Sequence, residues 1–253
     1  MIKTRLIPSI LLLDGRCVKG RQFDAFRDVG DPVKVAKVYD AQGADELIFL
    51  DVAATSEKRH TLMSIIGRAA EECFMPITVG GGVRTVEDFR ALLRAGADKI
   101  SINTEAVRRP ALITEAAARF GAQCVVVSID VRLQAPGDYR VFVNRGREPT
   151  GLDAIDWARR AVELGAGELL VTSIDREGTG SGFDLELVRT ITESVPVPVI
   201  AHGGAGSLVH LVEAIKEGQA SAVSAATLFH FTDQSVIKAR AYMRHAGLDV
   251  RLG

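Results

Sequence analysis

Two stretches of the sequence repeat one pattern, and this internal repeat restricts the fold more than any other feature. Residues 79–104 read VGGGVRTVEDFRALLRAGADKISINT, and residues 201–227 read AHGGAGSLVHLVEAIKEGQASAVSAAT. The Gly-Gly pairs at 81–82 and 203–204 are separated by 122 residues. A pattern that recurs at a fixed interval indicates a structure built from copies of one unit. The chain is therefore predicted to consist of two similar halves.

Short apolar runs alternate with amphipathic segments along the whole chain. Near-continuous hydrophobicity is typical of strands that are buried on both faces. The predicted strands cover residues 6–13, 46–51, 76–79, 99–102, 123–130, 168–174, 197–201 and 222–225. The predicted helices cover residues 32–42, 58–72, 86–95, 111–120, 154–164, 185–194, 208–217 and 235–245.

Eight strand–helix units with twofold similarity predict a closed (β/α)8 TIM barrel with half-barrel internal duplication. An open doubly wound sheet is the alternative. No linker or low-complexity segment interrupts the 253 residues, so we expect a single domain over 1–253. Residues 139–144 are predicted as a strand of a hairpin inserted after the fifth barrel strand.

Composition excludes several classes of function. The net charge is −1 with balanced acids and bases, so no basic field is available for nucleic acid. No apolar run is long enough to cross a membrane. The start, MIKTRLIPSILLLDGR, has the charge and apolar stretch of a signal peptide but no cleavage site, so it is interpreted as the first strand. We expect a cytoplasmic protein.

The cysteines and histidines form no metal pattern. Cys17, Cys73 and Cys124 are odd in number and widely spaced, which predicts reduced thiols and no disulfide framework. The five histidines show no paired spacing. The sequence therefore predicts neither a metal site nor a cofactor.

In TIM barrels, functional groups lie at the carboxyl ends of the strands and on the loops that follow them. Alternate residues of a strand face the same side, so Leu11 on the first strand and Asp130 on the fifth are expected to face each other across the mouth. Asp130 is a candidate general acid or base, with helix capping or a salt bridge as the alternative. Leu11 occupies the corresponding place in the other half, where no proton can be transferred.

Glycine-rich turns and polar residues recur after equivalent strands of the two halves. Glycine lets backbone N–H groups approach an anion, and a helix N-terminus or a threonine hydroxyl adds donors. The alternative is that these glycines only make tight turns. Repetition by symmetry predicts two phosphate sites on opposite sides of one mouth, and hence a bis-phosphorylated substrate. The candidate residues are Gly82, Asn103 and Thr104 in one half, and Gly203, Gly204, Ala226 and Thr227 in the other.

Three further residues near the mouth are candidates for support or substrate contact. Asp51 and Asp175 end strands at equivalent places, and they either orient ribose hydroxyls or hold Asp130 and the loops in place. Lys19 lies in residues 15–22, which are predicted to form a long first loop. This loop is either a lid over the mouth or an ordinary solvated loop.

Four charged residues lie near the starts of barrel strands, at the opposite end from the mouth. These residues are Arg5, Glu46, Lys99 and Glu168. If they point inward, they can form a closed ring of ion pairs at the bottom of the barrel. The ring is either a gate over an axial passage or an ordinary network at the rim.

Motifs along the whole chain resemble the cyclase subunit of imidazole glycerol phosphate synthase, the HisF family. They include KTRLIP, DGRCVKG, TVGGGVRT, GADKISINT, LVTSIDREGTGSGFD and AHGGAG. The resemblance implies an ammonia-using lyase of histidine biosynthesis, a glutaminase partner on the N-terminal barrel face and a bis-phosphorylated substrate. It also implies that Arg5, Glu46, Lys99 and Glu168 gate the ammonia, and that Gly178 joins the phosphate-binding set.

The sequence departs from this family at one catalytic position. The family uses two aspartates as general acid and base, of which one corresponds to Asp130 and the other to Leu11. Smaller departures are Glu177 and His202. Three readings stay open. The chain is an impaired cyclase, or a paralogue that delivers ammonia for amidination of another acceptor such as a surface-polysaccharide sugar, or a non-catalytic scaffold that docks a glutaminase. Paralogues associated with such sugars also lack the first aspartate.

Overall fold

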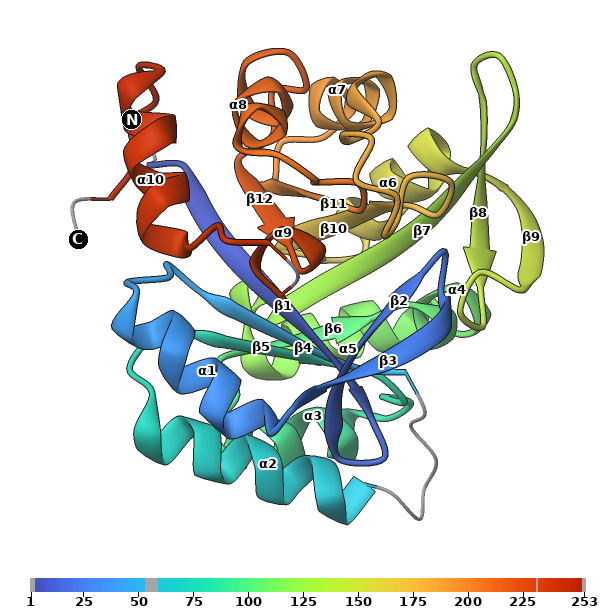
Figure 1. Ribbon diagram of the computed structural model, residues 1–253. Helices are drawn as coiled ribbons and strands as arrows, with labels where there is room; N and C mark the ends of the chain where they lie inside the picture. The colour runs from blue at the N-terminus through green and yellow to red at the C-terminus, as the bar shows by residue number, and fades with distance from the viewer. Residues whose placement is uncertain (1–2, 53–58, 231, 252–253) are drawn as a thin grey trace.

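The barrel strands close on themselves. The computed structural model describes residues 3–52, 59–230 and 232–251 (Figure 1). Within these ranges, eight parallel strands pair in the order β1, β4, β5, β6, β7, β10, β11 and β12, and β12 pairs again with β1. Their bounds are Arg5–Leu13, Leu47–Asp51, Ile77–Gly80, Lys99–Ile102, Val125–Ala135, Glu168–Ser173, Val199–His202 and Ala222–Ala225. This closed parallel sheet confirms the predicted TIM barrel.

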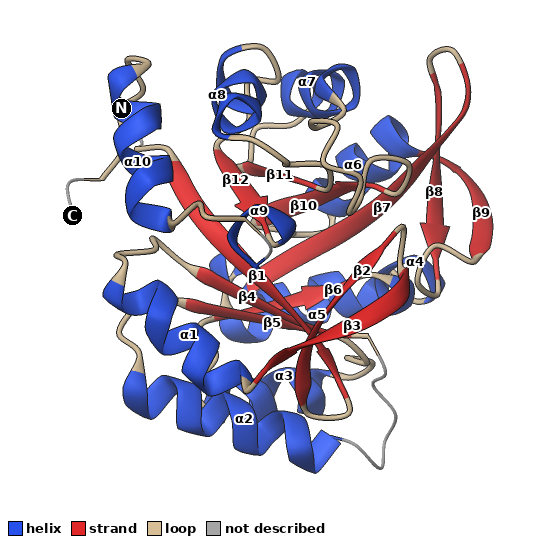
Figure 2. Cartoon of the chain, viewed as in Figure 1, coloured by secondary structure: helices blue, strands red, loops and turns tan. Residues whose placement is uncertain are grey.

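Helices surround the barrel on its outer side (Figure 2). The main ones are α1 Pro32–Ala41, α2 Arg59–Glu72, α3 Val86–Arg94, α5 Ala111–Phe120, α6 Ala154–Glu163, α7 Leu185–Ser194, α8 Leu208–Lys216 and α10 Val236–His245. Each overlaps a predicted helix, although Lys58, the first residue predicted for α2, lies outside the described residues. Two short helices, α4 Thr104–Arg108 and α9 Thr227–His230, follow β6 and β12. None of the described helices is both long and apolar enough to traverse a bilayer.

Local sequence explains where individual helices begin. In α3, the Thr85 hydroxyl accepts a hydrogen bond from the backbone N–H of Asp88 at 3.2 Å, and the Asp88 carboxylate accepts one from the Thr85 N–H at 3.0 Å. This reciprocal capping satisfies two N–H groups that the helix leaves unpaired. The cap fixes α3 directly after the glycine-rich turn that follows β5.

The apolar core has an outer and an inner layer. The outer layer packs the barrel strands against the helices and includes Phe49, Phe89 and Leu92, which are fully buried. The inner layer fills the barrel with Ile7, Ile48, Val126, Leu170, Ile200 and Ala222. Because every second residue of a strand points into the barrel, this inner layer lies between the charged residues at the strand starts and the polar residues at the mouth.

Each half of the barrel carries a β-hairpin after its first strand. The second half has β8 (Asp138–Val143) and β9 (Glu148–Asp153) after β7, so the predicted inserted hairpin is confirmed. The first half has β2 (Arg16–Arg21) and β3 (Asp24–Gly30) after β1. The prediction of a loop over residues 15–22 was therefore wrong, because residues 16–21 form a strand that pairs with β1 and β3. Lys19 lies on a strand of this hairpin.

A buried arginine ties the C-terminal segment to the barrel. The Arg240 guanidinium pairs with the Asp45 carboxylate at 3.1 Å and donates to the backbone oxygens of Gly43 and, at 2.8 Å, Arg251. The other Asp45 oxygen accepts from the Leu6 N–H at 2.8 Å. Arg240 therefore joins α10, the start of β1 and the chain after α10 at the N-terminal end of the barrel.

Arg240→Met is expected to lower the free energy of unfolding by about 3 kcal/mol, because it leaves the buried Asp45 carboxylate without its cation. Chemical denaturation measures this difference. Arg244→Met on the same helix is the control, since Arg244 is exposed and its loss is expected to change stability by less than about 0.5 kcal/mol. Equal stability of the two variants would contradict the role assigned to Arg240.

Candidate functional site

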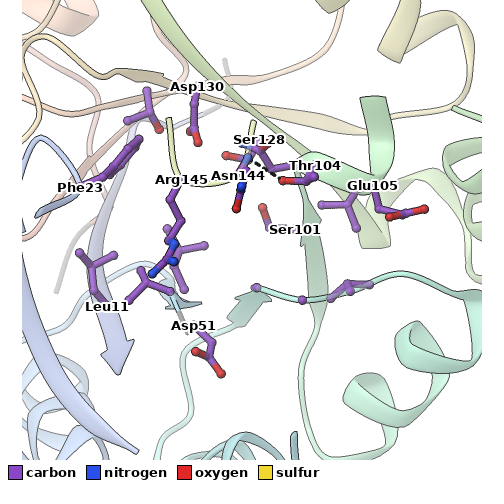
Figure 3. A pocket seen from close by; sticks show the side chains of 18 of the residues that line it. Leu11, Phe23, Asp51, Ser101, Thr104, Glu105, Ser128, Asp130, Asn144 and Arg145 are labelled. Carbon is purple, nitrogen blue, oxygen red and sulfur yellow. Dashed lines mark hydrogen bonds between the residues drawn. The ribbon is translucent and has the colours of Figure 1, made fainter. Parts of the chain in front are cut away.

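A pocket of about 520 Å³ opens at the carboxyl ends of the strands (Figure 3). Both hairpins contribute to its walls, through Phe23 and Phe26 of the first and Arg145 of the second. Leu11 and Asp130 line it on different sides, as strand alternation predicts. Leu11 is 4% exposed and pairs with Leu50 of β4, so this wall of the pocket is apolar.

Asp130 is a carboxyl group that changes charge close to neutral pH. Burial in the barrel raises its pKa to about 7, and the negative charge of Glu177 acts in the same direction. Hydrogen bonds from Asn103 and Thr172 oppose the increase without cancelling it. A group with a pKa near the working pH can both accept and release a proton. Asp130 therefore has the properties of a general acid or base, the role predicted for it.

His202 lies between Thr172 of β10 and Ser9 of β1, and contacts both hydroxyl groups. Its Nδ1 lies 3.1 Å from the Thr172 hydroxyl, and its Nε2 lies 3.2 Å from the Ser9 hydroxyl. Burial lowers the pKa of His202 to about 4, so the imidazole is neutral at neutral pH. A neutral imidazole donates through one nitrogen and accepts through the other. The chain of contacts from Ser9 through His202 to Thr172 leads to Asp130, which pairs with Thr172 in the sheet.

The first predicted phosphate set lies in the pocket. Gly82, Asn103 and Thr104 all line it, together with Gly81. Gly81 has a φ of 106°, and a Cβ there would lie 2.2 Å from the Asp51 backbone oxygen. Glycine is thus required at this turn by packing, whatever it binds. The Thr104 hydroxyl accepts a hydrogen bond from the Asn144 N–H at 3.1 Å, which fixes its position at the mouth.

The second predicted set does not line this pocket. Gly203, Gly204 and Ala226 are buried, and Thr227 is half-buried. A Cβ at Gly204 would lie 2.1 Å from the Gly182 oxygen, because the loops after β10 and β11 pack closely. Gly178 packs closely against the first hairpin, since a Cβ at Gly178 would lie 2.6 Å from the Gly20 backbone oxygen. Phosphate binding by this set remains a prediction.

The three support candidates have different surroundings. Asp51 ends β4 and lines the pocket. Asp175 is exposed, and its carboxylate accepts from the Leu133 N–H at 3.0 Å, which holds the end of β7. Lys19 forms an ion pair with Glu177, and both side chains are 3% exposed. That pair attaches the first hairpin to the loop after β10.

The four charged residues at the strand starts form a closed ring. Arg5 pairs with Glu46 at 2.6 Å and with Glu168, and Lys99 pairs with both carboxylates at 2.9 Å. Burial lowers the pKa of Arg5, but the two carboxylates outweigh this effect and raise it. The glutamates are 8% and 6% exposed, so each depends on the two cations for its charge compensation. The ring lies at the end of the barrel axis opposite the pocket.

The sequence prediction missed several residues that line the pocket, among them Phe23 and Arg145, and one exposed residue at the other end of the barrel, Phe74. Phe23 and Arg145 are at hairpin turns, where periodicity does not determine the direction of a side chain. Phe74 has a ring that is 93% exposed, in the connection from α2 to β5. This connection lies at the same end of the barrel as the ring of charges. The internal repeat could have drawn attention to Phe23 and Arg145, which are separated by the repeat interval of 122 residues, but no sequence feature singled out Phe74.

No metal centre is evident among the described residues, in which no group of three or more His, Cys, Asp or Glu side chains could hold an ion. The three cysteines are free. The repeated half-barrel, the glycine-rich turn with its polar neighbours and Asp130 at a strand end fit a known family. The family model described as "Histidine biosynthesis protein" matches residues 5–235, so the chain belongs to the family of histidine biosynthesis enzymes.

Proposed function

We propose that the chain is a cytoplasmic ammonia-using subunit of the imidazole glycerol phosphate synthase type. It receives ammonia from a glutaminase partner and uses it on a phosphorylated substrate held at the mouth of the barrel. The ring of Arg5, Glu46, Lys99 and Glu168 is the observation that carries this proposal. An isomerase of the same family has no need for a closed charged ring at the other end of the barrel.

The interior of the barrel supports the passage of a small neutral molecule. Between the ring and the pocket, most inward residues belong to the apolar cluster that includes Ile7 and Leu170, with the hydroxyl side chains of Ser224 and Thr78 on the same face as their paired residues in that cluster. Transfer of an ammonium ion through such a region is costly, whereas neutral ammonia carries no charge to desolvate. Opening of the ring would admit ammonia at the bottom, and Asp130 would meet it at the top.

The face around the ring has a feature suited to a partner. Phe74 is 93% exposed, yet its backbone is fixed because the Asp40 carboxylate accepts from the N–H groups of Phe74 and Met75, both at 3.1 Å. An exposed aromatic side chain on a backbone held in this way is typical of an anchor in a protein interface. Together with the ring, it favours this face as the glutaminase docking surface.

The mouth of the barrel has fewer acids for proton transfer than the cyclase reaction uses. Leu11 places an apolar side chain where the family has a second acid, so only Asp130 remains for proton transfer at these two positions. This observation favours a second candidate function, in which ammonia is delivered to another acceptor such as a surface-polysaccharide sugar. A non-catalytic scaffold that docks a glutaminase is a third.

Lys99→Met tests the ring. The variant leaves Glu46 and Glu168 with Arg5 alone, so the ring cannot remain closed in its present form. In a complex with a glutaminase that binds the chain, glutamine-dependent turnover is expected to fall several-fold relative to turnover with ammonium salt. Lys34→Met, an exposed change at the start of α1, is the control and should alter neither rate.

The ratio of the two rates is the decisive measurement, because it cancels a general loss of activity. An unchanged ratio in Lys99→Met would contradict a gating role. If no glutaminase binds the chain, the proposed partner is wrong, whatever the variant does. Histidine genes beside this one would favour the cyclase, and polysaccharide genes would favour the second candidate.

A further inference from the structure

Arg145 occupies a backbone conformation that favours glycine. It lies in the turn between β8 and β9, where Asn144 has a φ of 51° and Arg145 a φ of 59°. The Asn144 backbone oxygen accepts from the Arg147 N–H at 3.4 Å, so Arg145 and Gly146 are the two central residues of this turn, and both have a positive φ. Turns with positive φ at both central residues favour Asn, Asp or Gly at the first of them, which is arginine here. A non-glycine residue held in this region is strained, and such strain clusters at functional sites.

The surroundings of the turn fix it over the pocket. The Asn144 N–H donates to the Thr104 hydroxyl at 3.1 Å. On the other side, Gly146 approaches the ring of Phe23 so closely that a Cβ would lie 2.9 Å from it. The turn is therefore held between α4 and the first hairpin. From this position the Arg145 side chain extends into the pocket, towards Leu11 and Asp51 (Figure 3).

The guanidinium of Arg145 brings an unpaired positive charge to the site. Among the described residues it has no ion-pair partner, whereas Arg108, which also lines the pocket, pairs with Glu148 at 2.9 Å. On the wall that Arg145 approaches, Leu11 is uncharged, and the Asp51 carboxylate forms no ion pair with Arg145. His202 is also uncharged at neutral pH. A guanidinium is always charged and binds the two oxygens of a carboxylate or phosphate in a matched geometry.

We propose that Arg145 is a binding residue for an oxyanion, a phosphate or carboxylate group of the ligand, at the Leu11 side of the pocket. This inference rests on the proposed function, because it concerns the substrate of the same site. It deepens that function by giving the substrate a negative group beside Leu11, where the family has a catalytic carboxylate. The carboxylate that the family has at this position is replaced here by the apolar side chain of Leu11, with the positive charge of Arg145 on the same side of the pocket.

Calorimetric titration of the purified chain tests the proposal with three probes. Inorganic phosphate and ribose 5-phosphate test a phosphate group, and glucuronate tests a sugar carboxylate. Arg145→Gln is expected to weaken binding of the preferred probe by about 10- to 100-fold, the effect of losing one charged hydrogen-bonding group. Arg147→Gln is the matched control, because Arg147 is exposed in the same turn and does not line the pocket.

Arg145→Gly separates binding from folding. Glycine adopts the observed φ without strain, so this variant is expected to melt at a temperature no lower than that of the wild type, yet to lose the same affinity as Arg145→Gln. A weaker probe affinity in both variants with unchanged affinity in Arg147→Gln supports the proposal. The preferred probe then identifies the oxyanion as phosphate or carboxylate.

Two outcomes would overturn it. Equal affinity of the wild type and Arg145→Gln for a bound probe would show that the oxyanion lies elsewhere, while leaving ammonia use and phosphate binding intact. No binding of any probe by the wild type would overturn both this inference and the phosphorylated substrate. The glutamine-to-ammonium rate ratio of Lys99→Met is independent of Arg145, so failure of the ring and failure of the anion site are distinguished.

Discussion

Leu11→Asp is expected to raise ammonium-dependent turnover of the cyclase's bis-phosphorylated substrate by about 10²- to 10⁴-fold, the usual contribution of one positioned acid or base. Leu11 already lines the pocket with Asp130, so a carboxylate at this position needs no rearrangement of β1. The wild type is expected to turn over this substrate very slowly. Purified chain, ammonium salt and the bis-phosphate substrate are sufficient for the assay.

Leu11→Asn is the matched control, because asparagine has the size of aspartate and cannot transfer a proton. Turnover that rises equally in both variants would show that the gain comes from polarity or space. Wild-type turnover at the level of an ordinary cyclase would contradict the assignment of Leu11 as the disabling residue. If the substrate binds and neither variant turns over, a different acceptor is favoured.

A double variant tests whether Arg145 affects a carboxylate placed at position 11. A new carboxylate at position 11 would lie on the side of the pocket towards which the Arg145 side chain extends (Figure 3). An ion pair lowers the pKa of a carboxylate and weakens it as a base. The double variant Leu11→Asp with Arg145→Ser is therefore expected to exceed the single variant in turnover if Arg145 contacts the new acid.

The barrel could be predicted from the sequence because its determinants are periodic. Apolar runs and amphipathic segments recur through the whole chain, and the repeat interval of 122 residues fixes the two halves. Period-two alternation was sufficient to place Leu11 and Asp130 at one mouth, and Arg5 and Glu168 at the other end of the axis. These predictions depend only on which face of a strand a residue occupies.

The first hairpin was missed because β2 and β3 are short and partly exposed, with charged residues such as Lys19 and Asp28 among the apolar ones. Their stability comes from pairing with β1 and from the buried contact between Lys19 and Glu177, which are far apart in the sequence. The internal repeat contained the missing signal. A hairpin predicted after the fifth strand implies one after the first, at the same interval.

The two phosphate sets show the limit of symmetry as a guide. Sequence spacing treated Gly82 and Gly204 alike, but only the first lines the pocket. The loop after β10 packs over the second set, as the contact of Gly204 with Gly182 shows. Loop packing of this kind depends on side-chain volume and backbone path, which do not follow from spacing. The direction of Arg145 was unpredictable for the same reason.

Asp130→Asn is expected to have opposite effects on turnover and on stability. In the Leu11→Asp chain, it should reduce turnover by about 10²- to 10⁴-fold, because the amide cannot transfer a proton. In the wild type, it should stabilise the fold at neutral pH. Burial raises the pKa of Asp130 from 3.8 to about 7, so the charged carboxylate is less favourable in the folded chain than in the unfolded one.

The pH dependence of this stabilisation identifies the pKa without an activity assay. Between pH 3.8 and about 7, the folded chain holds a proton that the unfolded chain has lost, so wild-type stability decreases as the pH rises. The variant lacks this contribution. Its advantage over the wild type should be absent near pH 4, grow up to about pH 7 and then stay constant at no more than about 4 kcal/mol.

Denaturation of both chains from pH 4 to pH 9 measures this curve, and Asp156→Asn, an exposed change on α6, should give a flat difference. A flat difference for Asp130→Asn would mean that Asp130 titrates normally, which removes the reason to regard it as a proton-transfer group. The pH at which the rise levels off, about 7, should coincide with one limb of the pH–rate profile of the Leu11→Asp chain. Because stability and rate are independent measurements, their agreement would attribute that limb to Asp130.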